Sequence, residues 1–265
     1  MWLIYLLTAN IILFIFGIIF LTPKNFIKKN MLDIKKLILL VLNQYKFLLI
    51  IIIAFTFHLI EVNFLDSIAT DFVGYDYANI IVRIEDGFVN WFSQNWTPGI
   101  LHFFVLIYII IYPFSVWFAL FYYIVDSQKK ALKSLAYALI ITYMIALPFY
   151  LFLPITNVYT YYGSSSALET VLPTIEQFFY QATTPNNCLP SLHTAMAIFL
   201  AYTGSLTNNK KFAYFTYFIM ITVLISVIYL SIHWITDVIA GALVALVTIF
   251  LIERYIHKKE RYESN

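Results

Sequence analysis

Residues 190–206 read PSLHTAMAIFLAYTGSL, and residues 233–252 read HWITDVIAGALVALVTIFLI. Each stretch begins with polar or ionisable residues and continues as an apolar run that is typical of a membrane helix. The pattern places His193, His233 and Asp237 at the beginnings of two helices, where a membrane meets water. Ionisable groups at such positions are costly to keep and usually functional. The two stretches therefore predict a functional site at one face of a membrane.

The composition fits a protein that is largely embedded in a bilayer. The chain has 265 residues, of which 62% are hydrophobic and only 11% are charged, which is too apolar for a soluble domain of this size. About 20 apolar helical residues cross the roughly 30 Å of hydrocarbon in a bilayer. Seven segments are long enough, and we expect membrane spans at residues 2–21, 37–60, 100–125, 134–154, 190–206, 212–232 and 234–252.

The chain shows no internal repeat, no low-complexity segment and no flexible linker. We therefore expect an all-α, polytopic membrane helix bundle. Its parts would be an N-terminal transmembrane anchor with a basic loop (1–36), a membrane domain (37–252) and a basic tail (253–265). The first span lacks a preceding basic residue and a cleavage pattern, so an uncleaved anchor is favoured over a signal peptide.

Basic residues predict the orientation in the membrane. They follow the first span, separate the third from the fourth and the fifth from the sixth, and follow the seventh: Lys24, Lys28, Lys29, Lys35, Lys36, Lys129, Lys130, Lys133, Lys210, Lys211, Arg254, Lys258, Lys259 and Arg261. With alternating spans all of them fall on one face, which the positive-inside rule makes cytoplasmic. The loops 61–99 and 155–189 and the turn 231–233 then lie outside, most simply at the cell membrane, and the C-terminus lies inside.

The overall charge and the cysteine content argue against nucleic-acid binding and against an internal disulfide. The net charge of +2 averages a basic inner face and an acidic outer face, so nucleic-acid binding is not predicted. The single cysteine, Cys188, excludes an internal disulfide.

Small residues predict which helices pack together. They recur four residues apart in the fifth and seventh spans, a spacing that lets membrane helices approach closely: Ala197, Ala201, Gly241 and Ala245. We expect these two helices to be neighbours, which would bring His193 and His233 together.

The spacing of the histidines and the aspartate suits nucleophilic catalysis. His233 and Asp237 are four residues apart and share a helix face, so the carboxylate can accept from Nδ1–H and leave Nε2 free as a nucleophile. His193 can then act as a general acid near neutral pH. A lone His-x-x-x-Asp is more often a structural pair, and only the combination with His193 favours catalysis. A zinc site lacks a third ligand at a typical spacing, so no metal is expected.

The strings Pro190–His193 and His233–Asp237, followed by Ala240 and Gly241, resemble the second and third signature motifs of the type-2 phosphatidic acid phosphatase superfamily. The resemblance covers residues 37–252 and implies a six-helix core, with the first span as an addition. It also implies that His233 forms a phosphohistidine, that Asp237 is its partner, that His193 is the general acid, and that no metal or other cofactor is needed.

The sequence departs from the usual motifs of that family. Leu192 replaces a glycine in the second motif, and Val227 follows Ser226 where the third motif opens Ser-Arg. The first motif has no counterpart, since Leu153 and Ala146 stand where an arginine and a lysine are usual. All three fixed cations that normally hold the phosphate are missing. The Ser-Leu-His spelling and these losses resemble the inositol-phosphorylceramide-synthase-like branch.

Arg83 is the only one of the 16 Lys and Arg residues on the outer side in this topology. It lies in an amphipathic segment that we expect along the membrane surface, and a guanidinium can grip two phosphate oxygens. We therefore expect either that Arg83 folds over the site or that it pairs with an acid such as Glu85 or Asp86. Ser191, Leu192 and Asn187, with Asn186 and Tyr159, are the other candidates for substrate binding.

The function that these features predict is transfer of a phosphoryl or phospho-head-group from a membrane lipid at the extracytoplasmic face. Water as acceptor makes the protein a lipid phosphatase, and an alcohol makes it a transferase. The alternatives are a polyprenyl diphosphate phosphatase and a non-catalytic lipid-binding or transport protein that keeps the fold. A haloperoxidase is disfavoured because those relatives are soluble and use the missing cations. The expected partners are the bilayer and a lipid phosphate, and the sequence does not identify an oligomeric state.

Overall fold

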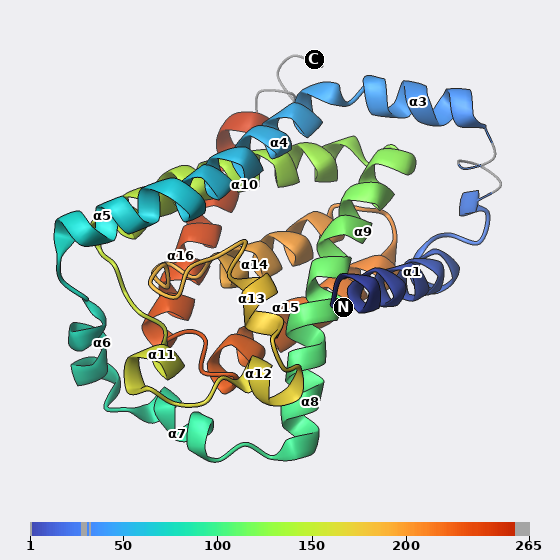
Figure 1. Cartoon of the computed structure of the whole chain (residues 1–265). Helices are drawn as coiled ribbons and strands as arrows, with labels where there is room; N and C mark the ends of the chain where they lie inside the picture. Colours follow the sequence, from blue (N-terminus) through green and yellow to red (C-terminus); the bar gives the residue numbers. More distant parts are fainter. Residues whose placement is uncertain (1, 28–30, 32, 258–265) are drawn as a thin grey trace.

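The computed structural model describes residues 2–27, 31 and 33–257 (Figure 1). Within these ranges the chain consists of helices and loops and contains no β-strand, which confirms the predicted all-α class. Its helices are α1 (Trp2–Leu21), α3 (Ile34–Leu42), α4 (Tyr45–Ile60), α5 (Asp66–Val73), α6 (Ala78–Glu85), α7 (Phe88–Gln94), α8 (Pro98–Leu106), α9 (Tyr112–Val125), α10 (Lys129–Phe152), α11 (Val158–Tyr162), α12 (Ala167–Val171), α13 (Ile175–Phe179), α14 (Leu192–Ser205), α15 (Lys210–Tyr229) and α16 (Ile235–Leu251). Three π-helical turns, η1 (Glu61–Leu65), η2 (Ile107–Ile111) and η3 (Ile252–His257), continue α4, α8 and α16.

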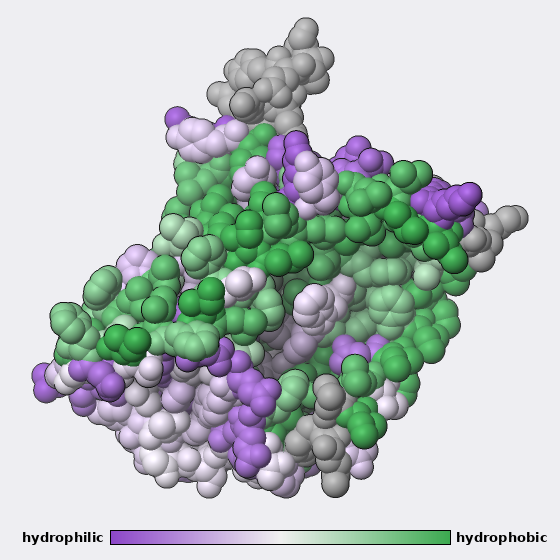
Figure 2. All heavy atoms as spheres, turned by 45° about the horizontal axis from the view of Figure 1, so that its top comes forward, coloured by the Kyte–Doolittle hydropathy of each residue, from purple (hydrophilic) through white to green (hydrophobic). Residues whose placement is uncertain are grey.

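Six helical segments of the described chain are long and apolar enough to cross a membrane: Ile4–Leu21, Tyr45–Val73, Pro98–Val125, Lys129–Phe152, Lys210–Tyr229 and Ile235–Ile256. Figure 2 shows hydrophobic side chains over much of one face, with hydrophilic residues gathered towards its rims. The expected span at 190–206 is instead the shorter helix α14, whose 14 residues cover only about 21 Å. Its cap at Ser191 and its end at Ser205 set this length.

The second expected span, 37–60, was wrong at both ends. The helix breaks at Asn43 and Gln44, so α3 is a separate helix without a buried residue. Gln44 fixes this break, because its side-chain amide donates to the carbonyls of Leu40 and Ile124. At the other end the helix continues through η1 and α5 to Val73.

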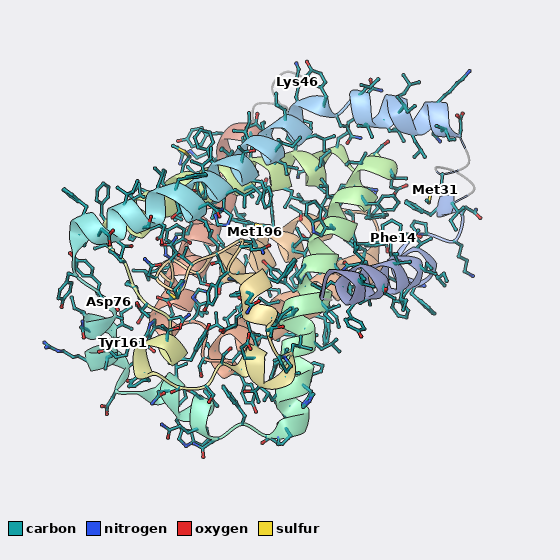
Figure 3. The ribbon with its side chains drawn as sticks, in the orientation of Figure 1. Phe14, Met31, Lys46, Asp76, Tyr161 and Met196 are labelled. Atoms are coloured by element: carbon teal, nitrogen blue, oxygen red, sulfur yellow. The ribbon has the colours of Figure 1, made fainter. Side chains whose placement is uncertain are left out.

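The expected amphipathic segment in 61–99 forms two short helices rather than one. Asp86 and Gly87 both have positive φ values, 48° and 71°, which end α6 and start α7 in a new direction. Asp76 fixes the start of α6, since its carboxylate accepts from the backbone N–H groups of Ala78 and Thr156. Figure 3 shows Asp76 and Tyr161 on neighbouring parts of this corner of the molecule.

Helix α14 lies in the middle of the bundle and packs against α10, α15 and α16 (Figure 1). Ala197, Ala201, Gly241 and Ala245 are all buried or nearly so, and the predicted pairing of α14 with α16 is confirmed. Helix α1 lies against the outside of α9, where the ring of Phe14 contacts those of Phe118 and Phe121.

The described basic segments at the starts of α10 and α15 and at the end of α16 lie at the helix ends opposite those that carry the two histidines. Lys28, Lys29, Lys258, Lys259 and Arg261 lie outside the described residues. The Lys130 ammonium lies 4.0 Å from the Glu253 carboxylate, which joins the start of α10 to η3. Asn209, which precedes Lys210, donates to the carbonyl of Leu21 at the end of α1. This grouping agrees with the charge pattern from which the orientation is predicted.

We predict that Gly241→Ala destabilises the protein. A Cβ at this position would lie 2.4 Å from the Ser191 carbonyl oxygen, a backbone atom that cannot turn aside. Helices α14 and α16 would have to separate, at a cost of about 1–3 kcal/mol for an overpacked site. Thermal unfolding of the purified protein measures the loss. Gly99→Ala is the matched control, because nothing lies within 4 Å of its new Cβ; equal unfolding temperatures for the two variants would contradict the close crossing.

Candidate active site

His233 and Asp237 form a buried pair at the start of α16. The His233 Nδ1 atom lies 3.3 Å from Asp237 Oδ2, and both residues are buried, with exposed fractions of 4% and 0%. The same carboxylate oxygen accepts from the backbone N–H of Trp234 at 2.9 Å. This capping contact holds the carboxylate in place, so it can orient the imidazole.

The predicted meeting of the two histidines is confirmed. His233 Nε2 lies 3.4 Å from His193 Nδ1, although the residues are 40 positions apart. On the other side of His193, Nε2 lies 3.0 Å from the hydroxyl of Tyr108. Tyr108 lies in η2, is 2% exposed, and places its ring centre 5.0 Å from that of His193.

These contacts form one directional chain of hydrogen bonds. A carboxylate only accepts, so His233 carries its proton on Nδ1 and donates to Asp237. Burial lowers the pKa of the His233 imidazole to about 4, an effect that the Cys188 backbone opposes, so the ring is neutral at pH 7 and Nε2 accepts. The Nδ1–H of His193 then donates to His233, and the Tyr108 hydroxyl donates to His193 Nε2.

Ser191 connects the helices that carry the two histidines. Its backbone N–H donates to the Asp237 carbonyl at 3.1 Å, and its hydroxyl accepts from Thr194 N–H as the N-cap of α14. This bond uses the Ser191 amide, so that amide is not free to bind an anion. Ser191 is fully buried, and a role for its hydroxyl in substrate binding stays a prediction.

Glu85 caps α16 from the neighbouring helix α6. Its carboxylate accepts from the backbone N–H groups of Ile235 and Thr236 at 3.1 and 2.7 Å, and from the Thr236 hydroxyl at 2.7 Å. Arg83, two residues earlier, is exposed and is not among the residues that line the cavity at the histidines. The structure thus brings Glu85 rather than Arg83 to this helix, and a phosphate-binding role for Arg83 stays a prediction.

A cavity of about 1290 Å³ opens from the histidines into the apolar part of the bundle. Its walls include Phe14 on α1, Phe55 on α4, Trp117 on α9 and Met196 on α14. Figure 3 places Phe14 and Met196 on separate helices, and Figure 2 shows the molecule hollowed near the centre of its hydrophobic face. The cavity therefore connects a polar site to surroundings that suit a hydrocarbon chain.

Only some of the other predicted binding residues line this cavity, and Asn186 and Tyr159 do not. Leu192 and Asn187 both line it. The side-chain amide of Asn187 donates to the Glu61 carboxylate at 2.7 Å, and that of Asn186 donates to the Thr70 hydroxyl at 2.6 Å. Tyr159 contacts Glu176 and Tyr180 in the loop that covers the site.

One group of side chains at the site has the composition of a metal centre. Candidate ligand atoms of Cys188, His233 and Asp237 lie within 4.8 Å of one another, and all three residues are buried. The Nδ1 and Oδ2 atoms of the last two already bond each other. Burial raises the pKa of the Cys188 thiol well above its usual range, so a thiolate ligand is disfavoured. The group fits a hydrogen-bonded dyad better than a metal.

Comparison with known protein families matches residues 78–251 to the PAP2 superfamily. Searches of curated proteins and of solved structures found no match.

We predict that Glu85→Ala lowers the unfolding temperature and weakens the site, because two amides and a hydroxyl at the start of α16 lose their acceptor. The loss of a helix cap costs about 0.5–2 kcal/mol. Asp86→Asn is the control, since Asp86 is exposed and asparagine tolerates its positive φ. Differential scanning calorimetry compares the two, and a Glu85→Ala variant as stable as the wild type would rule out the cap.

Proposed function

Since the chain belongs to the PAP2 superfamily, we propose that it is an integral membrane enzyme that transfers a phosphoryl or phospho-head-group from a lipid through a phosphohistidine. The observation that supports this most is the contact of His193, His233 and Asp237 at the polar end of an apolar cavity. The catalytic residues of the proposal are these three.

The reaction has two steps. The lone pair on His233 Nε2 attacks phosphorus, and the bond from phosphorus to the leaving oxygen breaks. His193, which is protonated on both ring nitrogens in the complex with the anionic phosphate, gives its Nδ1 proton to that oxygen and becomes neutral. In the second step His193 takes the proton of the acceptor hydroxyl, whose oxygen attacks phosphorus and releases His233. Asp237 keeps the His233 proton on Nδ1 and stabilises the positive charge that the ring gains.

The substrate has to open the contact between the rings. A phosphoryl group cannot lie between two nitrogen atoms 3.4 Å apart, so it enters beside them as His193 turns. Phosphoryl transfer needs in-line positioning and stabilised equatorial oxygens. Here neutral donors supply this in place of the usual cations, namely the Asn187 amide and the first turn of α14, and the transfer step itself needs no metal.

The apolar cavity supports a lipid as the substrate, and the end of the bundle opposite the basic segments supports an extracytoplasmic site. The Ser-Leu-His motif with Leu192 resembles that of the inositol-phosphorylceramide-synthase-like branch. This resemblance favours an alcohol over water as the acceptor. Phosphate release would identify a hydrolase, and a new phospholipid would identify a transferase.

We predict that the purified protein becomes labelled when it is incubated with a lipid that carries a label in its phosphate or phospho-head-group. The bound label should be stable to alkali and lost in acid, which is the behaviour of a phosphohistidine. His233→Ala abolishes the label, because it removes the Nε2 atom that attacks phosphorus. Rapid acid-free quenching and gel analysis measure it, after controls for folding by gel filtration.

The matched control is His102→Ala, because His102 is exposed and bonds only the Pro98 carbonyl in the described contacts. It should label as the wild type does. Label that persists in His233→Ala would refute the assignment of the nucleophile, and an unlabelled wild type across phosphatidic acid, other phospholipids and polyprenyl diphosphate would favour a non-catalytic lipid-binding protein.

We also predict that Tyr108→Phe slows formation of the phosphohistidine about 3- to 10-fold with little change in KM. The phenyl ring keeps the packing but removes the donor that fixes the tautomer of His193, an effect of about 0.5–1.5 kcal/mol. Single-turnover kinetics measure the rate. Tyr214→Phe, a 73% exposed position on α15, should leave it unchanged; an equally fast Tyr108→Phe would remove tyrosine from the mechanism.

A further inference from the structure

Two acidic residues lie inside the second membrane span, on the side that faces the site. Glu61 begins the π-helical turn η1 and Asp66 follows it, and the Asp66 N–H donates to the Glu61 carbonyl. This i to i+5 bond brings the two residues one above the other, which an α-helix would not do. Glu61 is 0% and Asp66 is 6% exposed. Short π-helical turns are frequent at functional sites.

The loop that leads to His193 covers these carboxylates. Asn187 donates to Glu61, Asn186 donates to Thr70 one turn beyond Asp66, and His58 bonds the Ala182 carbonyl at 3.0 Å. The face of the span that carries Glu61 is therefore joined to residues 182–187, directly before the catalytic motif.

Polar atoms without a hydrogen-bond partner are concentrated here. The described residues contain eight such buried side-chain atoms, and five of them belong to this cluster: His58 Nδ1, Glu61 Oε2, Asp66 Oδ1, Thr184 Oγ1 and Asn187 Oδ1. Three of the five are oxygens that can only accept. Buried polar groups are normally paired, so this cluster has the composition of a site whose ligand is a donor or a cation.

The protein supplies little positive charge to offset the two carboxylates. Among the described residues, His58 is the only ion-pair partner within 4 Å of either, and its Nδ1 lies 3.9 Å from Glu61 Oε2. The other neighbours are neutral, namely Tyr143 beside Glu61 and Asn186, Thr184 and Asn187 beside Asp66. Buried charges without a partner are costly, and a bound cation removes that cost.

The cluster opens on the cavity that contains the histidines. His58, Tyr143, Thr184 and Asn187 line the same cavity as His193 and His233. A molecule bound with its phosphate at the histidines can therefore reach the cluster with a neighbouring group.

We propose that Glu61 and Asp66, together with the oxygens of Thr184 and Asn187, form a cation-binding subsite next to the two histidines. Carboxylate, amide and hydroxyl oxygens are ligands of hard metal cations, and they equally accept from the N–H groups of an ammonium. The cation is thus either the ammonium of a lipid head group or a free metal ion. The first source rests on the function proposed above, whereas the second does not.

The test measures binding without turnover, in full-length protein that carries His233→Ala. Thermal unfolding is followed with MgCl₂ or CaCl₂ in one arm, and in the other with a short-chain phosphatidylethanolamine or the phosphatidylglycerol of equal chain length. We expect a rise in unfolding temperature with a metal ion, or with the ethanolamine lipid and not the glycerol lipid. Adding Glu61→Gln should weaken that binding at least tenfold.

Asp66→Asn is the second variant and should have the same effect. Asp71→Asn is the matched control, an exposed carboxylate on the same helix α5, and should bind as the parent does. Without ligand, Glu61→Gln should unfold no earlier than the parent, because glutamine still accepts from Asn187 and removes an unpaired charge; a purely structural glutamate would give a lower unfolding temperature.

Each result decides the matter. A metal response that Glu61→Gln abolishes identifies a free ion, and a head-group preference that Glu61→Gln abolishes identifies a lipid ammonium. The subsite is refuted when neither probe acts on the parent, or when both carboxylate variants respond as the parent does. Because His233 is absent throughout, a failure to trap the phosphohistidine leaves this outcome unaffected.

Discussion

The hydrogen bond from Ser191 N–H to the Asp237 carbonyl is the contact on which the site depends. This bond holds Ser191, the N-cap of α14, against the first turn of α16. The two helices cross closely there, and only a glycine at position 241 leaves enough room. The two imidazoles extend from the ends of these helices, so the crossing sets the 3.4 Å between them. This backbone contact therefore fixes the two helices against each other at the site.

The contact between the two histidines could be predicted from the sequence, because it follows from the local spacing of residues. The spacing of His233 and Asp237 on one helix turn, and the small residues Ala197 and Gly241 on two facing helices, determine a local geometry and a close approach. These features predict the meeting of the histidines from the sequence alone. The spans were predicted less well, because apolar content measures length only approximately, and a break such as that at Asn43 and Gln44 can divide a helix within an apolar run.

The residues that the sequence did not reveal act through tertiary contacts. Glu85 caps a helix that begins 150 positions later, and Tyr108 is one of 21 tyrosines in a strongly apolar chain. Glu61 and Asp66 did carry a signal, since ionisable residues within a membrane span are usually functional. The predicted second span ends at residue 60, which assigns Glu61 and Asp66 to a loop and conceals this signal. In the structure the π-helical turn continues the span to Val73.

The absence of the usual phosphate-binding cations can be explained by the surroundings of the two histidines. A buried cation beside neutral histidines would lower their basicity and compete for Asp237, whereas here the neutral Tyr108 hydroxyl bonds His193 and the neutral Asn187 lines the same cavity. Two further acidic side chains, Glu61 and Asp66, lie beside the cavity, and when ionised they repel a bare phosphate dianion. A phosphodiester carries one negative charge fewer and can bring a cationic neighbour with it. Within the proposed function, this arrangement of acidic groups is more compatible with a phosphate that is esterified on both sides than with a terminal phosphate.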